Sequence, residues 1–207
     1  MRFAEALKEI ESFWSDKPIP FQGGGEAALS RLQRQFAQPF PEELNEYISL
    51  VLPPGRFSLE MYGRYLTLSG YAELSNRHNG YNWNPIEYTP IAGWSPDWFL
   101  IGDYEADPVI VDLSRTGAPC PVFEAMHGAG AWKFHQVASS LPQFLLCATY
   151  MHHALTQLNH QPIIRKEQFL RTPKMLLADN VAAWLLSRIR HCDEKFYGYW
   201  VGYFSNA

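Results

Sequence analysis

The hydrophobic pattern of this chain changes its period twice. Up to about residue 48 the apolar residues recur every three or four positions, which is the spacing of one helix face. Residues 57 to 126 instead alternate, or form short runs rich in β-branched and aromatic side chains, as strands do. After residue 132 the helical spacing returns and continues to about residue 191. Because helices, strands and helices follow one another in blocks, the sequence predicts an α+β fold, with a largely antiparallel sheet flanked by helices.

Local signals place the expected elements within these blocks. Helices are expected at 3–14, from about residue 26, from Pro41 to the Pro53-Pro54-Gly55 stop, at 137–155 and at 177–191. Ser140 offers a hydroxyl for an N-terminal cap, and Pro142 fits the first turn that follows it. Five strands are expected, at residues 57–63, 64–71, 98–103, 109–113 and 121–126.

The composition indicates a globular protein, because 47% of the residues are apolar and only 18% are charged. No segment approaches the roughly 20 apolar residues of a membrane span, and charges interrupt the first turns where a secretory signal would be apolar. Cys120, Cys147 and Cys192 are far apart and form no CxxC pair, which favours reduced thiols. We therefore expect a cytoplasmic protein that does not act at a membrane.

Charge is distributed unevenly along the chain. Residues 1–130 hold 17 Asp or Glu against 9 Lys or Arg, whereas residues 131–207 hold 4 against 8. An acidic majority argues against nucleic-acid binding, because phosphates require cations to displace their counterions. The basic residues of the second part are scattered, as on a solvated helix face. A basic protein is therefore the expected partner of the acidic part.

Three carboxylates interrupt two apolar runs in the stretch WFLIGDYEADPVIVDLS, at Asp103, Glu105 and Asp107. Gly, Asp and Pro are turn formers, so GDYEADP reads as the connection of a hairpin in which Asp103 or Asp107 accepts backbone N–H bonds. An acidic edge that contacts a partner is compatible with that role. General acid–base chemistry is the least favoured alternative, because it needs a carboxylate in an apolar cleft and a turn is exposed.

Aromatic residues crowd the turn-rich stretch that precedes this hairpin, namely Tyr81, Trp83, Tyr88, Trp94 and Trp98. One interpretation makes several of them core residues, since a helix-on-sheet layer needs bulky side chains. In the other, Trp and Tyr beside carboxylates form a binding surface, where they give large contact area at low entropic cost. The sequence leaves both interpretations open.

Motifs of catalysis, metal binding and nucleotide binding are missing from the sequence, which contains no GxSxG, HExxH or GKS/T. His152 and His153 are adjacent, so on a helix they point about 100° apart and do not share one ion. We expect no enzymatic activity, no catalytic residue, no metal ligand and no cofactor.

Three segments together give the chain a resemblance to the SUKH superfamily, which groups fungal cell-wall-synthesis regulators with many bacterial immunity proteins. The first is QPFPEELNEYI, where Phe40, Pro41, Leu44 and Tyr47 match the family's spaced apolar pattern. The second is WFLIGDYEADPVIVDLS, and the third is PVFEAMHG with the later VASSLPQFL. Ala106 stands where the family has Gly, and Pro53-Pro54-Gly55 replaces its usual Asn-Gly.

The resemblance spans roughly residues 22 to 150 and implies a binding protein without enzymatic activity, in bacteria an antidote that occludes a cognate toxin, often a nuclease. We expect residues 1–150 to form the SUKH-like domain and residues 151–207 a C-terminal helical extension packed on the same core. The alternatives are an intracellular scaffold or regulatory interaction module and, less favoured, an enzyme of another type. The protein is expected to be a monomer or weak dimer, and its partner-binding residues are expected to be Asp103, Tyr104, Glu105, Asp107, Trp94, Trp98 and Trp83.

Overall fold

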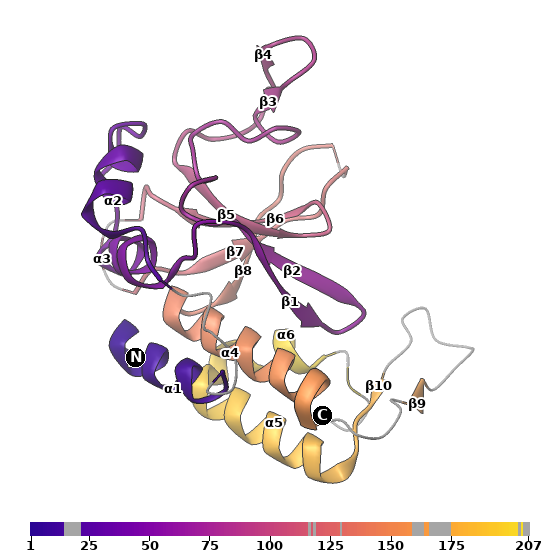
Figure 1. Ribbon diagram of the computed structural model, residues 1–207. Helices are drawn as coiled ribbons and strands as arrows, with labels where there is room; N and C mark the ends of the chain where they lie inside the picture. The colour runs from indigo at the N-terminus through magenta and orange to yellow at the C-terminus, as the bar shows by residue number, and fades with distance from the viewer. Residues whose placement is uncertain are drawn as a thin grey trace.

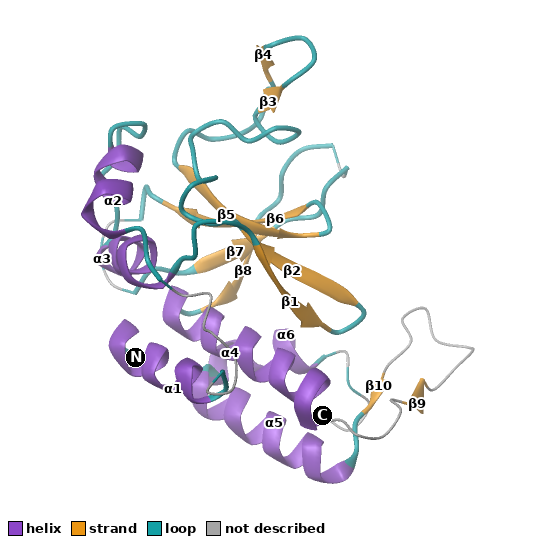
Figure 2. Cartoon of the chain, in the orientation of Figure 1, coloured by secondary structure: helices purple, strands orange, loops and turns teal. Residues whose placement is uncertain are grey.

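The computed structural model describes residues 1–14, 22–115, 117, 119–128, 130–158, 164–165, 175–202 and 204. Its centre is a six-stranded sheet in the order β1-β2-β5-β6-β7-β8, in which every neighbouring pair is antiparallel. Helices pack against this sheet (Figures 1 and 2). The predicted α+β class with a largely antiparallel sheet is therefore confirmed.

The strands of the central sheet are β1 (Phe57–Met61), β2 (Arg64–Leu68), β5 (Trp98–Tyr104), β6 (Asp107–Asp112), β7 (Val122–Glu124) and β8 (His135–Ala138). Two-residue strands form two small ribbons, β3 (Trp83–Asn84) with β4 (Thr89–Pro90), and β9 (Ile164–Arg165) with β10 (Met175–Leu176). The prediction was wrong at β8, where helix was expected from residue 137. There the chain extends to pair with β7, and the helix begins only after Ser140.

The helices are α1 (Phe3–Ser12), α2 (Gly25–Gln33), α3 (Glu42–Glu46), α4 (Leu141–His153), α5 (Asp179–Cys192) and α6 (Tyr197–Val201). Single π-helical turns extend α3 through Tyr47–Val51 and α4 through Ala154–Leu158. The predicted cap of α4 is confirmed, because the Ser140 hydroxyl accepts the backbone N–H of Gln143 and Pro142 lies in the first turn. Within the described residues, no helix is both long and apolar enough to cross a bilayer.

The two faces of the sheet are covered differently. Alternate residues such as Leu66, Phe99 and Val111 belong to the main core, which they share with Phe144 of α4 and with the other helices. The residues between them belong to a separate small cluster of Leu100, Ile110 and Phe123. Aromatic side chains pack on that cluster in place of a helix. We call this second side the open face.

The C-terminal helices pack on the same core as the N-terminal one. Val181 and Ile189 of α5 lie in the main cluster, and Arg188 donates to Glu9 of α1 at 2.8 Å. The buried Asp193 accepts both the backbone N–H and the hydroxyl of Ser139, each at 2.7 Å, which ties the end of α5 to the start of α4. The expected boundary at residue 150 falls inside α4.

The β1 edge of the sheet lies beside α4. The backbone N–H of Glu60 in β1 donates to Nδ1 of His152 at 2.8 Å. The ring of His152 is itself stacked on Trp14, with 5.4 Å between the ring centroids. A side chain of α4 therefore accepts a hydrogen bond from a backbone N–H of this edge strand.

Candidate protein-binding surface

The acidic stretch forms the tight turn between β5 and β6. Tyr104 and Asp107 are cross-strand partners, so Glu105 and Ala106 make a two-residue turn. Both have left-handed backbone conformations, with φ of 53° and 89°. Two such residues match the right-handed twist of the flanking strands. Ala106 thus occupies a conformation that favours the Gly of the SUKH pattern.

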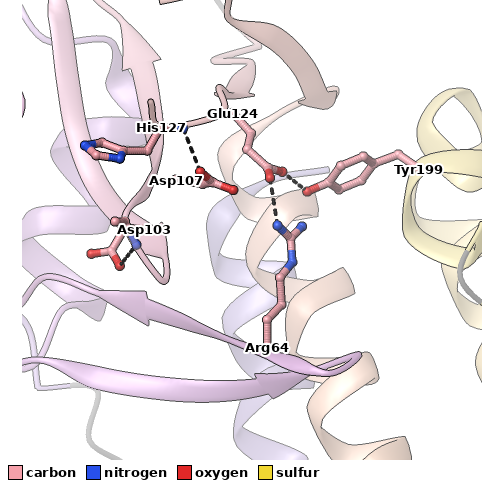
Figure 3. A network of polar contacts seen from close by, with 7 residues as sticks. Arg64, Asp103, Asp107, Glu124, His127 and Tyr199 are labelled. Atoms are coloured by element: carbon pink, nitrogen blue, oxygen red, sulfur yellow. Dashed lines mark hydrogen bonds and ion pairs between the residues drawn. The ribbon is translucent and has the colours of Figure 1, made fainter. Parts of the chain in front are cut away.

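Two of the three carboxylates hold this turn in place (Figure 3). Oδ1 of Asp103 accepts the backbone N–H of Ala106 at 3.2 Å, and Oδ1 of Asp107 accepts that of His127 at 2.7 Å. The predicted bond across the turn is therefore confirmed for Asp103, whereas Asp107 binds the loop that follows β7. Glu105 is exposed at the tip of the turn. Asp103 and Asp107 are each partly exposed.

Gly102 shapes the strand just before the carboxylates. The pairing of β5 with β6 shifts between Leu100 and Gly102, which is a β-bulge. A Cβ at Gly102 would lie 2.4 Å from the backbone oxygen of Thr67 on β2. Because that approach is too close for any side chain, only glycine fits here. The bulge reverses the alternation of β5 for the residues that follow.

The bulge also changes the side of the sheet to which Tyr104 points, and the expectation for this residue was wrong. Strict alternation would place it on the same side as Trp98 and Leu100, but its side chain turns to the main core and is only 2% exposed. The guanidinium of Arg64 lies over its ring at 3.8 Å. Tyr104 is therefore not part of the exposed surface, contrary to the expectation from the sequence.

Arg64 belongs to a buried polar network at the end of the sheet (Figure 3). It donates to Glu124 at 2.9 Å, and the hydroxyl of Tyr199 donates to the other oxygen of that carboxylate. Burial alone would lower the pKa of Arg64, but the charge of Glu124 and their hydrogen bond raise it above its usual range. The adjoining cavity has a volume of about 20 Å³, room for a single water molecule. The network stabilises the fold and leaves no space for a substrate.

An aromatic platform covers the open face next to the turn. It consists of Tyr81, Trp94, Trp98, Trp132 and Phe134, which are all partly exposed and form a chain of ring contacts. Centroid distances run from 4.6 Å for Trp98–Phe134 to 6.2 Å for Trp132–Phe134. All of these rings except Trp132 pack against Leu100, Ile110 and Phe123, and all five remain partly exposed. The interpretation of these aromatic residues as cover for a second core is therefore confirmed for Tyr81, Trp94 and Trp98, and their role in binding stays a prediction.

Tyr81 connects the platform to the acidic turn. Its hydroxyl donates to the backbone oxygen of Ala106 at 3.1 Å. Burial raises the pKa of Tyr81, and the nearby Asp103 and Asp107 raise it further. The phenol therefore stays protonated and keeps donating this bond. The carboxylates and the aromatic rings form one continuous surface.

Trp83 lies apart from the platform. It belongs to β3, in the small ribbon that projects from the fold, and the guanidinium of Arg77 lies over its ring at 4.4 Å. The structure thus brings together Asp103, Glu105, Asp107, Trp94 and Trp98, and separates Trp83 and Tyr104 from them.

Sequence reasoning missed Trp132 and Phe134. They stand two positions apart directly before β8, and a period of two places both on one side of a strand. Expecting helix after residue 132 hid that signal. His78 was missed too: it is 8% exposed, and its ring lies 6.0 Å from that of Trp94. Burial lowers its pKa to about 4.

The stretch of chain that supplies most of this surface is acidic, although Arg115 lies over the ring of Phe123 on the same face at 4.7 Å. Between His78 and Ser114 the sequence contains six Asp or Glu and no Lys or Arg. Rigid aromatic area with carboxylates at its rim is suited to contact with a basic protein surface. Comparison with the models of protein families, with curated proteins and with solved structures finds no match for this chain.

Proposed function

We propose that this chain is an immunity protein of the SUKH type, which binds a cognate bacterial toxin domain in the cytoplasm and occludes its active site. The three sequence segments that resemble the superfamily support this proposal, as does the α+β fold. The partner-binding residues of the proposal are Asp103, Glu105, Asp107, Trp94 and Trp98, together with Tyr81, Trp132 and Phe134.

The observation that carries the proposal is the open face, over which the described residues place aromatic rings and no helix, and where the aromatic platform adjoins the acidic turn. A sheet face that served only as core would be covered by another layer, because bulky aromatic side chains gain most when fully buried. The platform rings are instead half-buried and held by contacts with one another. Their rigidity limits the entropy that binding would cost.

In this mechanism the carboxylates select the partner and the rings anchor it. Active sites that bind phosphate backbones are lined with Lys and Arg, so a nuclease toxin presents the complementary charge. Electrostatic attraction accelerates the encounter, and burial of the platform slows dissociation. The toxin is inhibited by exclusion of its substrate, and no bond is made or broken by this chain.

Co-expression tests the proposal. The chain would be produced in a host together with the toxin domain encoded beside it, at a level of toxin that arrests growth. We expect growth to be restored, and the purified chain to inhibit the toxin at a one-to-one ratio. A variant of the platform, Trp94→Ala with Trp98→Ala, should lose protection, whereas the distant Leu50→Ala on the π-helical turn should keep it. Growth arrest with the wild-type chain present would contradict the proposal.

A further inference from the structure

Two of the three cysteines meet where α4 and α5 pack side by side (Figure 1). Cys147 lies in the middle of α4, and Cys192 is the last residue of α5. Both are free thiols, and the two residues are 0% and 5% exposed. The sequence did not indicate this pair, because its members are far apart and form no CxxC motif.

Gln143 fixes the position of Cys192 against α4. The sulfur of Cys192 lies 3.7 Å from the backbone oxygen of Gln143, and Nε2 of Gln143 donates to the backbone oxygen of Cys192 at 2.6 Å. In an α-helix the carbonyl of one residue accepts the backbone N–H of the residue four positions later, so the same Gln143 oxygen lies beside Cys147. The sulfur of Cys192 is therefore next to the turn of α4 that carries Cys147.

The two thiols also contact each other. Burial raises the pKa of Cys147 well above its usual value, and a hydrogen bond to the thiol of Cys192 raises it further. The thiols are therefore neighbours in the reduced protein. Neighbouring thiols on two separate elements are the arrangement from which a disulfide forms.

The end of α5 is held against the start of α4 by further bonds. Asp193 follows Cys192 and ends the helix, with a backbone φ of −146°. Its carboxylate accepts both the backbone N–H and the hydroxyl of Ser139. Because these bonds lie next to Cys192 in the chain, they keep its thiol close to α4 whether or not a covalent bond is present.

Cys120 offers a comparison within the same core. It is 1% exposed, and its backbone N–H donates to the carboxylate of Glu43 in α3 at 3.1 Å. Burial raises the pKa of Cys120 to about 12, and the charge of Glu43 raises it further. Three cysteines allow three different pairs, and the contacts of Cys147 with Cys192 favour one of them.

We propose that Cys147 and Cys192 form a reversible disulfide site, which joins α5 covalently to α4 when a disulfide oxidant of the glutathione class is present. One cysteine thiolate attacks a sulfur of the oxidant, whose S–S bond breaks and releases one reduced thiol. The other cysteine thiolate attacks the mixed disulfide and displaces the second reduced thiol. The protein loses two electrons and two protons, and the oxidant gains them. This inference does not depend on the proposed immunity function.

The disulfide would change how the C-terminal part of the chain is attached. In the reduced protein α5 is held by non-covalent contacts, such as that of Arg188 with Glu9. Oxidation adds a bond that closes the loop from residue 147 to residue 192, and such a bond restricts the unfolded chain. The oxidised protein is therefore expected to unfold at a higher temperature than the reduced protein.

The test uses the purified full chain and glutathione. The chain is refolded from urea at pH 8 in mixtures of reduced and oxidised glutathione, so that the buried thiols are reached and thiolate is available. Remaining thiols are then alkylated, and disulfide-linked peptides are identified by mass spectrometry. We expect a Cys147–Cys192 link and an alkylated Cys120. The thermal unfolding midpoint should rise by about 5–15 °C and return to the reduced value in dithiothreitol.

Variants of the three cysteines complete the test. Cys120→Ala should keep both the link and the shift in midpoint, whereas Cys147→Ala and Cys192→Ala should lose both. The wild-type measurement does not depend on the folding of any variant. Links that include Cys120 as often as the expected pair would overturn the proposal, as would the absence of a link in protein with a native circular dichroism spectrum. An unchanged or lowered midpoint in the linked protein would overturn it as well.

Discussion

At the scale of single residues, His78 shows how burial shifts the pKa of a side chain from its ordinary value. It lies in the turn-rich stretch SNRHNG, whose composition predicts a surface turn. The sequence does not reveal its burial, because the aromatic ring beside it belongs to Trp94, which lies outside this stretch. Its Nε2 is buried and has no hydrogen-bond partner in the described structure. The neutral ring is therefore favoured over the charged one.

The depressed pKa of His78 makes stability depend on pH. The unfolded state binds a proton near pH 6.5 and the folded state only near pH 4, so the contribution of His78 to folding is complete above 6.5 and is lost as the pH falls toward 4. Replacing His78 with Phe keeps a ring but removes the titration. In urea unfolding we compare the free energy of unfolding of the variant with that of the wild type. The variant's advantage should be about 2–3 kcal/mol larger at pH 4.5 than at pH 7.5.

A matched control is His191→Phe at an exposed position on α5. This variant should follow the pH profile of the wild type. Parallel profiles for His78→Phe and the wild type would show that the ring is not held neutral by burial.

At the scale of elements, the β5–β6 hairpin was predictable and the β3–β4 hairpin was not. GDYEADP carries the turn formers between two apolar runs, so the turn and its two hydrogen-bonding aspartates follow from the sequence. WNPIEYTP contains two prolines, Pro85 and Pro90, and its strands have only two residues, too short for any period to be detected. The bulge at Gly102 was also hidden, and it decides that Tyr104 faces the core.

The left-handed backbone at Ala106 gives a prediction for the β5–β6 turn. For a residue with a Cβ this region costs roughly 1–2 kcal/mol, and Gly removes that cost while losing about 0.4–1 kcal/mol to its freer unfolded state. Ala106→Gly should therefore stabilise the protein by about 0.5–1 kcal/mol in chemical denaturation. Its N–H to Asp103 is retained.

The opposite sign is expected for Ala183→Gly, which lies at an exposed position within α5. Gly in a helix interior costs about 1 kcal/mol relative to Ala. Destabilisation by both substitutions would show that the turn at residue 106 is not left-handed in solution.

At the scale of the whole molecule, the acidic residues near the turn should govern how fast a basic partner arrives. D103N/E105Q/D107N removes three charges but keeps an acceptor oxygen for each turn bond. We expect association with the proposed toxin partner to slow about three- to tenfold at low salt and to approach the wild-type rate near 0.5 M salt, because screening then shortens the reach of the charges to about 4 Å. Stopped-flow mixing over a salt series would measure this.

A control with the same net charge tests whether the location of the charges matters. E11Q/E26Q/D179N removes three exposed carboxylates from the helices. It should slow association much less. An equal loss would mean that total charge, and not the acidic turn, steers the encounter.

The order in which blocks of helices and strands follow one another was sufficient to predict the class of the whole fold. It did not predict how these elements pack together. The contacts that join α1, α4 and α5, such as Arg188 with Glu9 and Asp193 with Ser139, link residues more than 50 positions apart. No local pattern contains them. The same limit applies to the platform, where Trp94 and Trp132 meet across the sheet.

The bond from Glu60 to His152 restricts how a second protein can attach. Many complexes form when a foreign strand lengthens an existing sheet through its unpaired edge amides. At β1 the imidazole of His152 already accepts a hydrogen bond from one of those amides. An added strand would therefore first have to displace this side chain of α4. Docking at that border by backbone pairing is therefore disfavoured.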